Sequence, residues 1–111
     1  MFYERKDNEI ITEAINIMGD NISFVVTDDG ILTDDGYTYR NAVMNEEYQR
    51  WGNGDGVGVI VDQYGCGLFN KEIVCRIYNN DLDSAVMKMI QAITAVESHL
   101  YFSITGRKRR K

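Results

Sequence analysis

The sequence contains an Asp-Asp-Gly unit twice, at residues 28–30 and 34–36, and this doublet limits how the chain around it can fold. Asp-Gly is a strong turn signal, because glycine adopts positive φ without strain and aspartate can bond nearby backbone N–H groups. The flanking segments are β-branched and aromatic, which is typical of strands. They are residues 23–27, 31–33 and 37–40. The doublet therefore predicts a hairpin whose second unit either bulges the return strand or ends it. The four aspartates that this arrangement places near one sheet end are Asp28, Asp29, Asp34 and Asp35.

Apolar residues near the N-terminus recur at the i, i+3, i+4, i+7 spacing of an amphipathic helix. They are Ile11, Ala14, Ile15 and Met18. Asn8 is of a type that caps helix starts, and Gly19 is of a type that ends helices. The sequence therefore predicts an N-terminal helix between these two residues.

A longer helical pattern follows Asp81 and Asp83, either of which can cap it. Its apolar residues form a heptad seam: Leu82, Val86, Met89, Ile93, Val96 and Leu100. The seam is short and further apolar residues widen it, which favours packing on the domain's own sheet. The alternative is a homodimer through this C-terminal helix.

The middle of the chain predicts one or two short helices and a second hairpin. Residues 41–51 mix apolar and charged side chains in a way that suits a helix. Residues 57–64 have the composition of a strand but the apolar spacing of a helix, and we favour a helix. Residues 67–78 alternate as two strands that turn at Asn70 and Lys71. The predicted fold is α+β, with a small antiparallel sheet of two hairpins packed against an N-terminal helix and a long C-terminal helix.

The chain of 111 residues, 44% of them hydrophobic, is large enough for one core and too short for two. We expect a single domain over residues 1–106 and a basic tail at residues 107–111. No apolar run reaches the ~20 residues that span a bilayer, and the start lacks a signal-peptide stretch, so we expect a cytoplasmic protein without membrane contact. Cys66 and Cys75 form no zinc-binding pattern, which predicts reduced and mostly buried thiols.

The net charge of −5 is unevenly distributed along the chain. The five basic residues 107–111 leave 7 basic against 17 acidic residues, a net charge of −10, in residues 1–106. Between Asp7 and Tyr39 there are eight acidic residues and no Lys or Arg. Such a surface repels nucleic acid and attracts basic partners, although acidic residues also serve simply to keep small proteins in solution.

Patterns of catalytic and metal-binding residues are absent from the sequence. The doublet lacks the glutamate at the twelfth position of a calcium loop, and neighbouring aspartates on an extended segment point to opposite faces. The glycine-rich segment 53–56 lacks the lysine of a phosphate-binding loop, and His99 falls late in a mostly apolar helical pattern, where we expect a structural or surface histidine. We therefore expect no metal ion, no cofactor and no catalytic residue, hence a binding protein and not an enzyme.

Residues 31–39 read Ile-Leu-Thr-Asp-Asp-Gly-Tyr-Thr-Tyr and resemble the hallmark of a bacterial and phage domain-of-unknown-function family, whose signature is leucine, threonine, aspartate, aspartate, glycine, tyrosine, threonine. Residues 64–68 and 89–96 are similar to that family's glycine-containing turn and closing helix. The resemblance covers residues 22–100. It implies an origin in phages, prophages and mobile elements, brings no assigned activity, and supports a helix at 57–64.

Aromatic residues beside the aspartates complete a candidate binding surface. Tyr37 and Tyr39 are two residues apart and would share one face of a strand, and tyrosine is enriched at binding hot spots. The predicted partner-binding residues are Asp28, Asp29, Asp34, Asp35, Tyr37 and Tyr39. Carboxylates on such a surface can compete with nucleic acid for Lys and Arg grooves. The sequence favours a phage or mobile-element DNA mimic that inhibits a nucleic-acid-binding defence complex of its bacterial host, of the anti-CRISPR or anti-restriction kind.

The basic tail supports a second hypothesis. Its residues are Arg107, Lys108, Arg109, Arg110 and Lys111, which can neutralise several phosphates in a salt-dependent manner. The alternative function is therefore a nucleic-acid-associated regulator, either monomeric or dimeric through the C-terminal helix.

Overall fold

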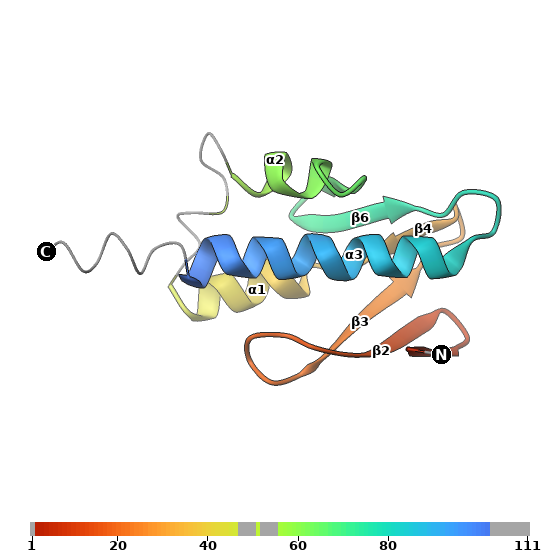
Figure 1. The fold of residues 1–111 in the computed structure, drawn as a ribbon, viewed down its shortest axis with the longest axis horizontal. Coiled ribbons are helices and arrows are strands. Elements are labelled where there is room, and N and C mark those ends of the chain that lie inside the picture. The colour runs from red at the N-terminus through yellow and green to blue at the C-terminus, as the bar shows by residue number, and fades with distance from the viewer. Residues whose placement is uncertain (1, 47–50, 52–55, 103–111) are drawn as a thin grey trace, which may run out of the picture.

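The computed structural model describes residues 2–46, 51 and 56–102, and it shows helices packed on a six-stranded antiparallel sheet (Figure 1). The strands are β1 (Tyr3–Lys6), β2 (Glu9–Ile15), β3 (Asn21–Val26), β4 (Ile31–Thr33), β5 (Gly67–Phe69) and β6 (Glu72–Arg76). They lie in the order β1-β2-β3-β4-β6-β5, and every neighbouring pair is antiparallel. The predicted α+β class with an antiparallel sheet is confirmed.

The helices are α1 (Tyr37–Met44), α2 (Val57–Asp62) and α3 (Leu82–Glu97), and a π-helical turn, η2 (Ser98–Phe102), extends α3. The long helix α3 runs across the sheet (Figure 1). Its cap is Asp81, whose side chain accepts a hydrogen bond from Ser84 N at 3.1 Å. The long C-terminal helix and the short helices between the strands are therefore both confirmed.

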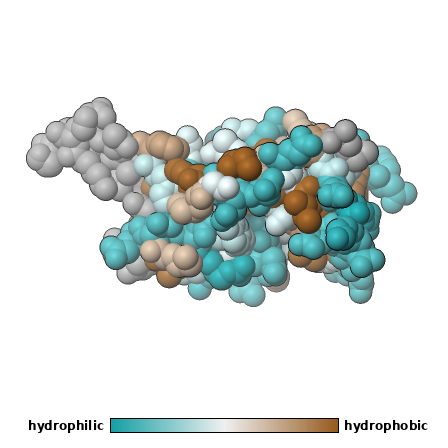
Figure 2. Space-filling model, turned by 90° about the horizontal axis from the view of Figure 1, so that it is seen from below, coloured by the Kyte–Doolittle hydropathy of each residue, from teal (hydrophilic) through white to brown (hydrophobic). Residues whose placement is uncertain are grey.

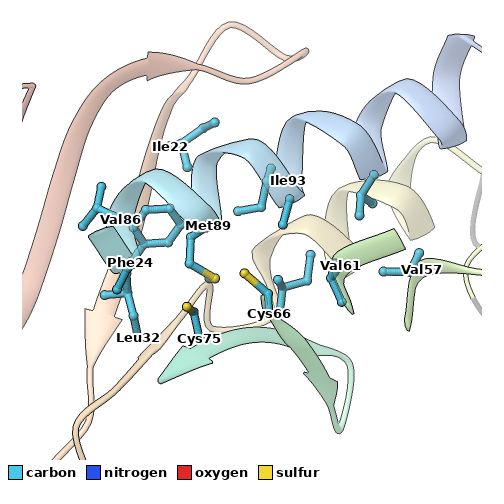
Figure 3. Close-up of a cluster of buried hydrophobic side chains, with 14 of the residues drawn as sticks. Ile22, Phe24, Leu32, Val57, Val61, Cys66, Cys75, Val86, Met89 and Ile93 are labelled. Carbon is cyan, nitrogen blue, oxygen red and sulfur yellow. The ribbon is translucent and has the colours of Figure 1, made fainter. Parts of the chain in front are cut away.

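The heptad seam of α3 is buried in the protein's own core. Val86 and Met89 are fully buried and belong to one cluster with Phe24 and Leu32 of the sheet (Figure 3). The predicted packing of this helix on its own sheet is confirmed. A homodimer through α3 therefore has only the outer side of the helix to use, where Met87 is 44% exposed.

The side chains of β2 alternate between the core and solvent. Ile10 and Thr12 are buried, while Glu9 and Glu13 are exposed. Strand β3 follows the same rule, with Phe24 buried and its neighbours exposed. At these two strands one sheet face therefore packs on the core and the other is turned to solvent.

The predicted N-terminal helix is wrong, because this segment forms β2 and pairs with both β1 and β3. The predicted helical pattern was that of Ile11, Ala14, Ile15 and Met18, which fit a period of 3.6. The residues buried in the strand are instead Ile10 and Thr12, which fit a period of two. The β-branched side chains of Ile10, Ile11 and Thr12 favour the strand, and the partner strands on both sides decide the outcome. Strand β1 itself was not predicted.

The predicted strand character of residues 37–40 is also wrong, because helix α1 begins there. The second Asp-Asp-Gly unit ends β4, which was one of its two predicted roles, and Gly36 at φ 77° turns the chain into α1. Three other predictions are confirmed: the hairpin of β3 and β4, the helix α2, and the hairpin that turns at residues 70–71.

The tail at residues 107–111 and residues 53–55 of the glycine-rich segment lie outside the residues that the structure describes. Within the described part of the chain, no helix has both the length and the apolar character needed to cross a membrane.

Candidate functional site

The first Asp-Asp-Gly unit forms the turn between β3 and β4 and exposes both of its aspartates. The turn is closed by Thr27, whose N–H donates to Ile31 O at 2.8 Å and whose O accepts from Gly30 N at 3.1 Å. Thr27 Oγ1 also accepts from Ile31 N at 3.2 Å. Asp28 and Asp29 are exposed at the tip of this turn, so their carboxylates are accessible to another molecule.

The second unit uses its first aspartate inside the protein. Asp34 is only 3% exposed, and its carboxylate accepts three backbone hydrogen bonds. Oδ1 accepts from Gly36 N at 2.9 Å and from Ile73 N at 3.0 Å, and Oδ2 accepts from Thr38 N at 3.2 Å. Burial raises the pKa of Asp34, although these hydrogen bonds oppose the rise. Asp34 thus joins α1 to β6 and is not available to a partner.

The two Asp-Asp-Gly units lie at opposite ends of β4, because one precedes this strand and the other follows it. The prediction that all four aspartates gather near one sheet end is therefore wrong. Asp35 is exposed at the far end from Asp28, and its backbone O accepts from Arg40 Nη1 at 2.8 Å.

The two predicted tyrosines lie on helix α1 and not on a strand. Residues two apart on a helix differ by about 200° in direction, so their side chains leave on different sides. Tyr37 donates its hydroxyl proton to Asp20 Oδ2 at 2.6 Å. The Tyr39 ring packs edge-on against Trp51, with centroids 5.2 Å apart, and Lys71 Nζ lies 5.1 Å from its centre. The prediction that the tyrosines share one sheet face is wrong.

A different set of acidic residues meets where three connections converge at one end of the sheet. The turn after β1 approaches the end of β3, because Val26 N donates to Asn8 O at 2.7 Å. The β3–β4 turn approaches the loop after β6, because Ile77 N donates to Gly30 O at 2.9 Å. Tyr3 of β1 donates a hydrogen bond to Asp83 at the start of α3. The exposed aspartates that these connections bring together, here called the acidic end, are Asp7, Asp28, Asp29, Asp81 and Asp83.

The members of the acidic end differ in how freely they can bind another molecule. Asp81 is the cap of α3, and Asp83 is bonded to Tyr3, whose pKa is raised to about 12 by burial and by this carboxylate. Asp28 and Asp29 are exposed in the β3–β4 turn. Arg5 and Lys6 directly precede Asp7, and Arg5 Nε donates to Asp7 O at 2.8 Å. Basic side chains therefore accompany Asp7, whereas residues 27–30 of the β3–β4 turn include two acidic residues and no Lys or Arg.

The acidic surface continues over β1 and β2. A shallow cavity of about 400 Å³ lies over these strands and the start of β3, and its lining includes Glu4, Glu13 and Asn21. Seen from below the view of Figure 1, the same end of the molecule is predominantly hydrophilic, and apolar residues are scattered over this side instead of forming one patch (Figure 2). A partner of this surface must therefore be recognised mainly through charge.

A family model described as a domain of unknown function, DUF1828, matches residues 12–96 of the chain. The chain belongs to the DUF1828 family. This confirms the predicted membership of a domain-of-unknown-function family. Comparisons with curated proteins and with solved structures found no match.

The DUF1828 match includes both Asp-Asp-Gly units, while β1 and Asp7 precede it. The β3–β4 turn of the acidic end is thus part of the matched region, and the β1–β2 turn lies outside it. Among the residues that the structure describes, no group of three or more His, Cys, Asp or Glu side chains is placed to hold a metal ion.

Sequence reasoning missed the approach of Asp7, Asp81 and Asp83 to Asp28 and Asp29. Asp7 was assigned to a segment before a helix, so its position in a hairpin turn beside β3 was not predicted. Residues 3–6 read Tyr-Glu-Arg-Lys and do not alternate between apolar and polar side chains, so no local strand pattern marks β1.

Proposed function

We propose that this protein is a non-enzymatic binding protein whose acidic end occupies a basic, nucleic-acid-binding surface of another protein. The supporting observation is the convergence of three connections that expose Asp7, Asp28 and Asp29 at one end of the sheet. Asp34, which is buried, is not part of this surface.

Charge explains how such a surface would act as an inhibitor. A cluster of carboxylates lowers the electrostatic potential around it and accelerates encounter with Lys- and Arg-rich grooves. Nucleic acid enters those grooves through the same attraction to its phosphates. An acidic protein bound there excludes the nucleic acid by occupying the groove.

The proposed target is a defence complex of a bacterial host, and the proposed source is a phage or mobile element. Defence complexes of the CRISPR and restriction kinds must hold nucleic acid in basic channels, so an acidic competitor is chemically suited to block them. The signature-like residues 31–39 support the phage context. The protein would act in the host cytoplasm.

Charge reversal tests the role of the β3–β4 turn. The variant Asp29→Lys changes an exposed residue of the acidic end, and Asp62→Lys makes the same change in charge on α2, which packs against β5 at the opposite sheet edge. Each protein is produced in bacteria with an active CRISPR or restriction system, and the plating efficiency of a targeted phage is counted. We expect wild type and Asp62→Lys to raise plating, and Asp29→Lys to lose about tenfold or more of that gain.

Equal protection of the phage by Asp29→Lys and Asp62→Lys would contradict a role of the acidic end. A wild-type protein that raises plating against none of a panel of CRISPR and restriction systems would contradict the inhibitor proposal itself. With purified defence complex, the effect of Asp29→Lys should appear mainly in the association rate and should weaken as salt is added.

Deletion of the basic tail distinguishes the proposed inhibitor from the alternative function. We propose the nucleic-acid-associated regulator as the second candidate, on the single observation that residues 107–111 are all Lys or Arg. Deleting these five residues should abolish retention of DNA or RNA by a regulator, with a steep salt dependence in the full chain. An inhibitor that acts through the acidic end should keep its effect on plating after the same deletion.

A further inference from the structure

Cys66 and Cys75 stand opposite each other in the hairpin of β5 and β6. Residues 70–71 form its turn and both have positive φ, of 54° and 70°, as in a two-residue type I′ turn. The register pairs Gly67 with Val74. One position farther from the turn, Cys66 is therefore directly across from Cys75.

The position of this pair in the ladder suits a disulfide. In a two-residue hairpin the pair next to the turn exchanges backbone hydrogen bonds, and bonded and non-bonded pairs then alternate. Counted from the turn, Cys66 and Cys75 are the fourth pair and so occupy a non-hydrogen-bonded site, at which Cα atoms lie about 4.5 Å apart. Disulfides span Cα separations of roughly 4.4–6.8 Å. Consistent with this, Cys66 N donates to Val61 O at 3.0 Å and not across the hairpin.

The two thiols have different acidities. The neighbouring Cys66 thiol and the positive charge of Lys88 lower the pKa of Cys75 to about 7, against the opposing effect of burial. The neighbouring Cys75 and burial raise the pKa of Cys66. Because the thiolate is the reactive form of cysteine, Cys75 is the nucleophile of the pair and Cys66 is its neighbour of lower acidity.

Lys88 reaches this pair from helix α3 across the turn before Cys66. A Cβ placed on Gly65, which has φ 79°, would lie 3.5 Å from Lys88 Cδ. The side chain of Lys88 therefore lies over the chain next to Cys66. With Cys66 7% exposed and Cys75 2% exposed, only a small oxidant can reach the sulfurs, whose place in the core is shown in Figure 3.

We propose that Cys66 and Cys75 are a redox site that hydrogen peroxide oxidises to an intrachain disulfide. The Cys75 thiolate attacks one peroxide oxygen, the O–O bond breaks, and the departing hydroxide takes a proton to become water. The sulfur of Cys66 then attacks the resulting sulfenic acid on Cys75, the S–O bond breaks, and a second water leaves. In total, two thiols lose two electrons and two protons, and one peroxide is reduced to two waters. The new bond joins the segment after α2 to β6, the strand that lies next to the edge strand β5.

Peroxide treatment of the full-length protein, reduced beforehand, tests this proposal. After treatment at neutral pH the protein is denatured, its remaining thiols are alkylated, and intact mass and a peptide map are recorded. Since the chain has only two cysteines, we expect both thiols to disappear together, one monomeric product with a Cys66–Cys75 bond, and full recovery of both thiols with dithiothreitol.

Variants separate a redox pair from two inert buried thiols. Cys66→Ser should give a sulfenic acid on Cys75 that dimedone traps, and Cys75→Ser should consume peroxide at least about tenfold more slowly. Lys88→Gln should move the pH profile of the oxidation rate to higher pH, because a positive charge near Cys75 is lost. Circular dichroism verifies that each variant is folded, and for any that is not, the wild-type product decides the outcome.

Three results would overturn the proposal. The first is persistence of both thiols under conditions that oxidise glutathione in the same solution. The second is oxidation that gives only disulfides between chains. The third is an unchanged pH profile in folded Lys88→Gln.

Discussion

The Asp34 carboxylate holds three backbone N–H groups, those of Gly36, Thr38 and Ile73, in a buried position. Replacement by alanine leaves all three donors without this acceptor, and each buried unsatisfied donor costs about 1–3 kcal/mol. We expect Asp34→Ala to lower the free energy of unfolding by about 3 kcal/mol or more. Urea denaturation followed by circular dichroism measures this loss.

A matched substitution in the other Asp-Asp-Gly unit separates burial from turn chemistry. Asp29→Ala changes an exposed turn residue, and we expect its effect to stay within about 0.5 kcal/mol. Asp34→Asn keeps one acceptor oxygen and should fall between the two alanine variants. Equal losses for Asp34→Ala and Asp29→Ala would contradict the role assigned to Asp34.

The same tripeptide therefore has two roles, and only one of them could be predicted from sequence. Turn chemistry at both units follows from Asp-Gly alone, because it depends on neighbouring residues. The burial of Asp34 depends on Ile73, which is 39 positions away and reaches it only after β6 pairs with β4. A local pattern contains no information about such a partner, which is why Asp34 was predicted to be accessible.

At the scale of whole elements, prediction succeeded where one local signal dominates. Helix α3 has a long apolar seam and a capping aspartate, and the β5–β6 hairpin has alternating strands around a short turn. At helix α2 two local signals disagree: the β-branched composition favours a strand, and the spacing of the apolar residues favours a helix. The spacing predicts the observed helix.

Prediction failed at elements for which the local sequence suits a helix about as well as a strand. β2 fits both a helical and a strand period, and pairing with β1 and β3 on its two sides fixed it as a strand. The start of α1 has strand-forming residues, Tyr37 and Thr38, but the Asp34 carboxylate accepts a hydrogen bond from Thr38 N and supports a helix there. In both cases tertiary contacts overrode propensity.

At the scale of the whole molecule, the charge of each segment could be read from sequence but its placement could not. The eight acidic residues between Asp7 and Tyr39 were predicted to form one field. The fold places Asp28 and Asp29 before β4 and Asp34 and Asp35 after it, and it buries Asp34. Asp81 and Asp83 join the end that holds Asp28. The candidate surface is thus acidic as predicted, but only Asp28 and Asp29 of the six predicted residues belong to the acidic end.

Buried acids also tie the stability of the whole fold to pH. Burial raises the pKa of Glu97, against the effect of a hydrogen bond from Ile17 N to Oε1 at 3.0 Å, and burial raises the pKa of Asp34 as well. Both side chains line one small cavity of about 10 Å³ between the sheet and the end of α3. The folded state therefore binds these protons more tightly than the unfolded state does. The contribution of these two groups to stability is fully present below their unfolded pKa values, 4.5 for Glu97 and 3.8 for Asp34, and is lost as the pH rises through the higher folded values.

Glu97→Gln isolates this effect, because it removes the buried charge and keeps an oxygen that can accept from Ile17 N. We expect the melting temperature of the variant, relative to wild type, to be higher at about pH 8 than at about pH 5, since only the wild type is penalised by ionisation. Any loss of stability that the amide causes independently of pH is the same at both pH values, so it cancels in that comparison. Glu13→Gln removes the same charge from an exposed site on β2, and its difference from wild type should vary much less with pH. If the two variants show the same pH dependence, the effect comes from the overall negative charge and not from the burial of Glu97.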